Sequence, residues 1–210
     1  NVKAMVHCWY LGPMSGVALA DVLSGKVNPS GKLPVTFAKK QDDYRCFQFG
    51  KRGYPGVDGQ VYYDEGIYVG YRWFNTKNVQ PQFPFGFGLS YTTFRYGKPT
   101  LSAKTMTHDG NITVTVPVTN TGKLAGKEVV ELFIGDVRSS EERPTKELKN
   151  FAKVELAPGE TKTVTFNITA TDLEYWSAKT HAFVAEPGAF KAYICASETD
   201  VRGVADFELK

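Results

Sequence analysis

Paired carboxylates are the residues of this chain whose types could do acid–base chemistry. They are Asp42-Asp43 and Asp64-Glu65. Two carboxyls that cleave a glycosidic bond face each other about 5–5.5 Å apart for retention of configuration, or about 6.5–9.5 Å apart for inversion. Neighbours in sequence point in different directions, so neither pair supplies that geometry alone. A solvated surface position, or a charge near the positive end of a helix, is the favoured role.

Other catalytic and ligand-binding patterns are absent from the sequence. The three histidines have no metal-ligand spacing: His7, His108 and His181. The chain contains no CxxC, no GxSxG, no P-loop and no GxGxxG. Ser15 lies outside any nucleophile motif and is explained as a helix cap. We therefore predict no catalytic residue, no metal and no cofactor in the chain.

Composition limits the class of protein and its partners. The 210 residues carry a net charge of +3 without a long Lys/Arg run, so we predict no nucleic-acid partner. No apolar run approaches the roughly 18–20 residues that cross a bilayer, which predicts no membrane span. Asn1 starts the chain without Met or a basic leader, so we expect no signal peptide and a fragment or processed chain. Buried free thiols are the favoured reading of the three cysteines, with a Cys8–Cys46 bridge left open: Cys8, Cys46 and Cys195.

Helix and strand signals are mixed in residues 1–80. The apolar run Val2–Cys8 predicts a buried strand of an α/β sheet, and Gly16–Ser24 predicts a short helix. Leu33–Phe37 predicts a short edge strand because Pro34 cannot donate to a ladder. An irregular loop is expected from Lys39 to Gln60, followed by a helix over Ile67–Phe74.

Residues 81–97, here the aromatic segment, are predicted to separate two units. Its run Pro81–Phe94 holds five aromatic residues, with Gly86 and Gly88 between them and Pro81 and Pro84 ahead of them. Glycine permits positive φ and proline removes a donor, so a long helix or a regular central strand is excluded. We expect a bent wedge that packs between its neighbours.

Residues 98–210 follow a period of two, which predicts strands alone. Turn sequences such as Ala157-Pro-Gly separate the runs, as in a β-sandwich of the immunoglobulin or fibronectin type III kind. Tyr175, Trp176 and Phe183 are interpreted as part of its core. The predicted strands are residues 112–116, 129–134, 151–156, 164–168, 190–194 and 204–209.

Three blocks of sequence are similar to one family. Ala18–Phe37 (ALADVLSGKVNPSGKLPVTF) resembles the end of the α/β sandwich domain of glycoside hydrolase family 3, which contains β-glucosidases and β-xylosidases. Tyr63–Phe74 and Phe85–Phe94 resemble two further blocks of that family, so the resemblance covers almost the whole chain. It implies an α+β chain: the end of an α/β sandwich (1–80), the aromatic segment (81–97) and a fibronectin type III-like domain (98–210).

The resemblance implies a retaining β-glycosidase, most simply a β-glucosidase acting on β-linked glucosides or oligosaccharides. In that family the aspartate nucleophile lies in a (β/α)₈ barrel and the acid/base glutamate lies earlier in the α/β sandwich. Neither motif matches a position here, so no catalytic residue is assigned and Glu65 is interpreted as structural. The missing barrel and early α/β sandwich would be partners in the same or a separate chain, and a periplasmic or secreted location is expected from relatives.

Substrate contacts are expected from two loops. Trp9 and Tyr10 follow the predicted first strand, where ligands bind at the carboxyl edge of α/β sheets. They begin a loop, Trp9–Gly16, in which the proline of the family's pattern has moved. Asp43 and Tyr63 lie in the second loop, Asp42–Tyr63, here called the long loop. Two alternatives remain at this stage: an independent fibronectin-like module that binds carbohydrate or a protein, or one half of a split enzyme.

Overall fold

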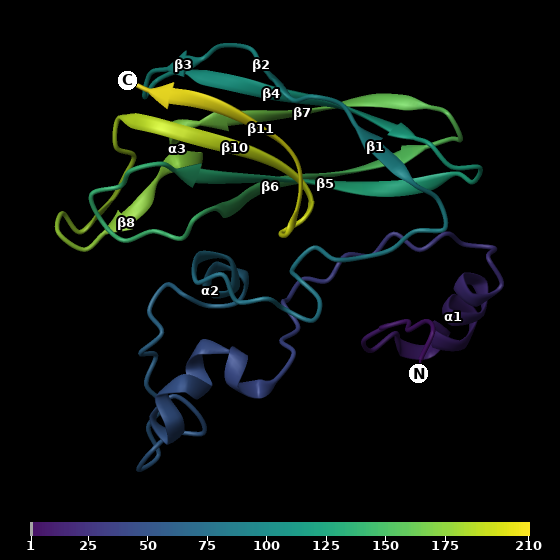
Figure 1. Cartoon of the computed structure of the whole chain (residues 1–210), viewed down its shortest axis with the longest axis horizontal. Coiled ribbons are helices and arrows are strands. Elements are labelled where there is room, and N and C mark those ends of the chain that lie inside the picture. Colours follow the sequence, from purple (N-terminus) through teal and green to yellow (C-terminus); the bar gives the residue numbers. More distant parts are fainter. Residues whose placement is uncertain (1) are drawn as a thin grey trace.

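A β-sandwich forms the upper layer of the molecule, and two short helical parts lie beneath it (Figure 1). The computed structural model describes residues 2–210. One sheet has the order β1-β4-β2, with β7 also paired to β4: β1 (Phe94–Tyr96), β2 (Thr100–Leu101), β4 (Asn111–Asn120) and β7 (Thr161–Thr169). The other has the order β3-β11-β10-β5-β6: β3 (Thr105–Met106), β5 (Gly126–Asp136), β6 (Glu147–Leu156), β10 (Gly188–Ser197) and β11 (Asp200–Leu209).

The core of the sandwich follows from strict alternation along the strands. Ile112, Val114, Val116 and Val118 of β4 are fully buried, while the residues between them are partly exposed. β-Branched residues pack well on a pleated surface with one wet face. The six strands predicted from period two therefore lie within β4, β5, β6, β7, β10 and β11. The strands β1, β2 and β3 were not predicted, because two or three residues are too short to show a period.

Helices are confined to short pieces. The predicted helix near residue 16 is α1, although its N-cap is Met14 and Ser15 makes no cap hydrogen bond. The long loop is more regular than predicted, because it contains two 3₁₀ helices, η2 and η3. The remaining small elements are η1 (Gly12–Met14), α1 (Ser15–Leu23), η2 (Gln41–Asp43), η3 (Arg45–Arg52), α2 (Tyr71–Thr76), α3 (Ala170–Leu173), β8 (Tyr175–Ser177) and β9 (Ala182–Val184).

Both strands predicted in the first 80 residues are absent, and that prediction was wrong for the described residues. Residues 2–8 form no strand, and Val2, Met5 and Val6 are exposed. In the second predicted strand, Leu33–Phe37, the structure has only an isolated antiparallel bridge between Phe37 and Phe83. A strand is stable only where neighbours accept its hydrogen bonds, and residues 2–210 supply no parallel sheet for Val2 to Cys8.

The predicted helix over Ile67–Phe74 begins later than expected, at Tyr71. Its N-cap is Gly70, whose φ of 58° lies in the left-handed region. That conformation interrupts a right-handed helix and separates Ile67–Val69 from α2. Trp73 and Phe74 of α2 are buried, whereas Ile67 and Val69 before it are exposed.

Two aromatic residues that were interpreted as core are exposed. Trp176 and Phe183 lie on the β8–β9 hairpin with 55% and 66% of their surface accessible. Their rings contact edge to face at 5.3 Å. A two-stranded hairpin outside both main sheets has no second layer to cover it.

The cysteines are all free, and only Cys195 is fully buried.

The aromatic segment packs as the predicted wedge. Phe85 contacts Tyr71 of α2 and Phe133 of β5, with ring centroids 5.0 and 6.4 Å apart. Main-chain hydrogen bonds join it to the preceding chain, because Gly86 N donates to Leu33 O at 2.8 Å and Leu33 N donates to Phe87 O at 2.9 Å. We call the region where residues 28–32, α2 and the aromatic segment meet the five-stranded sheet the junction.

Asn120 of β4 joins the end of the aromatic segment, at Thr92, to the sandwich. Its side-chain amide donates to Leu124 O and Leu156 O at 2.8 and 3.0 Å. Its Oδ1 accepts from Thr92 Oγ1 at 2.7 Å and from Gly122 N at 3.1 Å. Both N–H donors and both carbonyl lone pairs of this fully buried amide are thus used.

We expect Asn120→Ala to lower the free energy of unfolding by about 3 kcal/mol, because it leaves buried carbonyls and a buried hydroxyl without partners. Urea denaturation of the chain measures this. Asn167→Ala, at an exposed position of β7, is the matched control and should leave the urea midpoint unchanged. Equal midpoints for the two variants would refute the role given to Asn120.

Candidate functional site

Trp9 and Tyr10 lie on an exposed corner of the chain. Trp9 has a φ of 48° and is half exposed, and Tyr10 is fully exposed. The ring of His7 bridges Trp9 and Phe37, at centroid distances of 4.3 and 5.3 Å. Trp9 is therefore oriented by neighbouring rings, while Tyr10 has no ring contact within residues 2–210.

Asp43 and Tyr63 belong to the long loop but have different environments. Asp43 closes η2: Lys40 N donates to its carboxylate at 3.3 Å, and Trp73 Nε1 donates to its main-chain oxygen at 2.9 Å. The Asp43 carboxylate therefore acts as a local cap. Tyr63 is strongly exposed at the far end of the loop.

Ion pairs and ring contacts hold this loop in place. Arg52 Nε donates to the Asp64 carboxylate at 2.5 Å, and the Arg52 guanidinium lies 3.7 Å from the centroid of Tyr62. The hydrogen bond to Asp64 raises the pKa of Arg52. Glu65 Oε2 is buried without a hydrogen-bond partner in the described chain. The carboxylates of Asp64 and Glu65 thus have different surroundings. This agrees with the expectation that neighbouring side chains point in different directions.

The four predicted substrate-contacting residues occupy two separate places. The N-terminal segment near α1 and the segment that carries η2 and η3 lie on opposite sides below the sandwich (Figure 1). Across residues 2–210, no hydrogen bond, ion pair or ring contact links Trp9 or Tyr10 to Asp43 or Tyr63. These residues remain candidates, and the described chain does not assemble them into one site.

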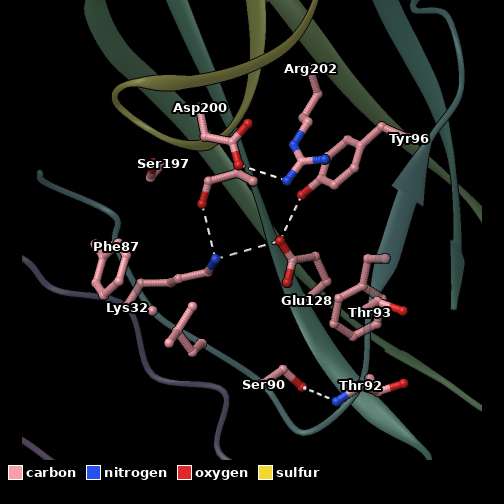
Figure 2. Close-up of a pocket in the computed structure, with 14 residues that line it drawn as sticks. Lys32, Phe87, Ser90, Thr92, Thr93, Tyr96, Glu128, Ser197, Asp200 and Arg202 are labelled. Carbon is pink, nitrogen blue, oxygen red and sulfur yellow. Dashed lines mark hydrogen bonds and ion pairs between the residues drawn. The ribbon is translucent and has the colours of Figure 1, made fainter. Parts of the chain in front are cut away.

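A cavity of about 450 Å³ opens at the junction, between the aromatic segment and the end of β10. Figure 2 shows Lys32 and Glu128 pointing toward one another across it. Lys32 Nζ lies 3.5 Å from Glu128 Oε1 and donates to Ala196 O at 2.9 Å. Tyr96 OH donates to the same Glu128 oxygen at 2.8 Å, and Arg202 pairs with Asp200 at 2.6 Å.

The buried polar side chains of this cavity form hydrogen bonds and ion pairs with one another. Burial, with the nearby Glu128 carboxylate, raises the pKa of Tyr96 far above its usual value, so the phenol stays protonated and donates. Glu128 accepts from both Lys32 and Tyr96. Glu128 Oε1 is thus shared by Lys32 and Tyr96, and the raised pKa of Tyr96 holds the phenol proton in this contact. The cavity is best explained as part of a structural joint between two layers.

A second set of buried charges joins α2 to the sandwich. Lys146 Nζ lies 3.5 Å from Glu198 Oε1 and donates to Glu198 O at 2.6 Å. Asn75 of α2 donates to the same carboxylate at 2.5 Å, and Glu198 N donates to Phe85 O at 2.9 Å. Burial raises the pKa of Glu198, and Lys146 and Asn75 oppose that rise. One residue thereby ties together β10, α2 and the aromatic segment.

These buried charges were not predicted from the sequence. A signal was available, because Glu131 interrupts the apolar run Val129–Ile134 and Glu198 follows the apolar end of β10. A charge inside a buried strand indicates a second packed face.

No group of three or more His, Cys, Asp or Glu side chains suited to a metal ion occurs among the described residues. Within the same range, no helix is long and apolar enough to cross a membrane.

We expect Lys146→Met to lower the free energy of unfolding by about 3 kcal/mol, because a buried Glu198 carboxylate would lose its cation. Glu198→Gln should cost a similar amount, and the double variant should cost less than the two together. Lys191→Met/Asp206→Asn removes an exposed pair as the control and should leave the urea midpoint unchanged. Additive effects of the two buried substitutions would contradict the pairing.

The structure thus defines a β-sandwich with short helices packed below it, and sequence comparison shows which domains the two parts resemble. The profile of the glycosyl hydrolase family 3 C-terminal domain matches residues 1–71, and that of the fibronectin type III-like domain matches residues 128–198. Residues 1–71 are therefore similar to the C-terminal domain of glycosyl hydrolase family 3, and residues 128–198 are similar to a fibronectin type III-like domain.

Individual relatives match over nearly the whole chain. The β-glucosidase BoGH3A of Bacteroides ovatus is 54% identical over 208 residues, which are 99% of this chain and 28% of that protein. A β-glucosidase of Rhizobium radiobacter is 46% identical over 209 residues, or 25% of its length. The crystal structure of the Bifidobacterium adolescentis GH3 β-glucosidase is 38% identical with a TM-score of 0.89, covering 96% of this chain and 29% of that one. The chain spans about a quarter of the length of these relatives.

Proposed function

We propose that this chain is the C-terminal part of a retaining β-glucosidase, with the nucleophile and the acid/base residue outside these 210 residues. The observation that carries the proposal is that β-glucosidases align with 99–100% of the chain, whereas the chain covers only 25–28% of them.

The chain's exposed apolar surface supports a missing partner layer. Large side chains are exposed along the N-terminal segment and α1: Val2, Met5, Val6, Leu11, Met14, Val17 and Leu23. Burial of such surface contributes about 25 cal/mol per Å². The early α/β sandwich and the barrel would cover this surface, in the same chain or a separate one. The division into 1–80, 81–97 and 98–210 belongs to this proposal.

The loops below the sandwich would then approach the acceptor side of a β-linked glucoside. Tyr10 and Tyr63 offer exposed rings, which can stack on sugar C–H groups, and Trp9 and Asp43 hold the local backbone. The structure of a Thermotoga neapolitana relative, with a TM-score of 0.86, contains α-D-glucose. A relative named periplasmic β-glucosidase in Salmonella typhimurium supports a location outside the cytoplasm.

An independent carbohydrate-binding module is the second candidate, and the exposed Trp176 and Phe183 favour it. Their rings are inclined at 75°, so they do not form one flat platform for a sugar chain. A polysaccharide pull-down with the chain and with Trp176→Ala distinguishes this candidate from the first.

A chimera tests the first proposal. We expect the Bacteroides ovatus β-glucosidase to keep β-glucosidase activity within about tenfold when this chain replaces its matching 208 residues, because 54% identity should preserve the packing surfaces. Hydrolysis of an aryl β-glucoside measures it. This chain alone should show no turnover above background. A soluble, folded chimera without activity, or turnover by the chain alone, would refute the proposal.

Tyr63→Ala in that chimera tests the substrate contacts. We expect KM for a cello-oligosaccharide to rise about five- to tenfold, since one stacked ring is lost. The kcat for a short aryl glucoside should stay unchanged. Tyr54→Ala, at another exposed tyrosine of the same loop, is the matched control. An equal KM for both variants would remove Tyr63 from the proposed site.

A further inference from the structure

Glu131 is a buried carboxylate that nothing in the chemistry above employs. It lies on β5 and is 3% exposed. Its Oε2 atom has no hydrogen-bond partner in the part of the chain that the structure describes. Buried carboxylates in folded proteins are normally paired with a cation or hydrogen bonded. Glu131 is therefore a group whose charge state the fold does not support.

The carboxyl faces the aromatic segment at Gly86. A Cβ placed on Gly86 would overlap both oxygens of Glu131. Gly86 is buried with a φ of +78°, and its amide donates to Leu33 O. The neighbouring residue Phe85 accepts a hydrogen bond at its main-chain oxygen from Glu198 N. Any change at Glu131 thus acts directly on the hydrogen bonds that fix the aromatic segment to its two neighbours.

The charges around Glu131 do not balance it. They come from the segment before the aromatic segment, from β5, from the chain before β6 and from the chain after β10: Lys32, Glu128, Lys146 and Glu198. Cys195 of β10 is a neutral thiol, because burial raises its pKa to about 12. Lys32 pairs with Glu128, and Lys146 pairs with Glu198. Residues Phe85–Phe87, which cover Glu131, bring no charge. Glu131 is the carboxyl left without a cation.

We propose that Glu131 is a proton-dependent switch at the junction, which fixes the aromatic segment on the sandwich when neutral and loosens it when charged. A neutral carboxyl fits tightly under Gly86 at little electrostatic cost. A charged one places an uncompensated anion between the segment and the sheet. Water must then enter, and the junction opens locally.

The direction of the pH dependence follows from burial. Burial raises the pKa of Glu131 from an ordinary 4.5 to about 7, helped by Glu128 and Glu198 and opposed by Lys32 and Lys146. The folded chain holds this proton more tightly than the unfolded chain. Its contribution to stability is therefore complete below pH 4.5 and is lost as pH rises through about 7.

Thermal unfolding at a series of pH values tests the switch. Between pH 5.5 and pH 8.5 we expect the Tm of the full chain to fall by about 5 °C, with a midpoint at about pH 6 and no further fall above about pH 7. Glu131→Gln, a neutral isostere, should remove this fall. Glu208→Gln, at an exposed position of β11, is the control and should keep it. The same fall in Glu131→Gln as in the unchanged chain would overturn the proposal.

Two further measurements keep the test decisive if Glu131→Gln does not fold. Lys32→Met removes a cation that stabilises the charged form, so it should move the midpoint to higher pH. Hydrogen exchange of the Gly86 and Glu198 amides, corrected for intrinsic rates, should speed up at least tenfold from pH 5.5 to pH 8.5. Amides between β4 and β7 should not change. An unmoved midpoint, or uniform exchange across both regions, would overturn the proposal.

Discussion

The packing of the aromatic segment on the outer face of the five-stranded sheet is the constraint on which the rest of the structure depends. The sandwich has its own core between the two sheets, built from alternating apolar residues. The first 80 residues bury only a small cluster around Tyr68, Trp73 and Phe74. They hold their shape because Phe85 and Tyr71 pack on Phe133, and because Asn75 and Lys32 bond to the sandwich.

The chemistry of that contact explains why its charges are buried. Lys32, Lys146, Glu128 and Glu198 are nearly inaccessible, yet each has a partner from another element. Such pairs add little net stability over apolar residues but are costly to break singly. They therefore specify the alignment of two layers more than they add to its strength.

The candidate site stays a prediction, whereas much of the fold was predicted correctly. Sequence blocks indicated the family, and the comparisons match the same family over residues 1–71. Trp9 and Asp43 were chosen from loop position alone, and the structure gives each a local structural contact. The junction charges, such as Glu131, lacked any sequence motif, because burial of a single glutamate depends on a segment 45 residues away.

The sequence by itself determined the strands with long alternation, because period two shows directly which face of a strand meets the core. It also determined the turns between them and indicated the family. Tertiary structure decided the rest. Val2–Cys8 forms no strand since no neighbour is present to accept its hydrogen bonds, and α2 begins at Tyr71 because Gly70 adopts a positive φ. Trp176 is exposed and Glu131 is buried, since coverage by another layer, and not residue type, determines accessibility.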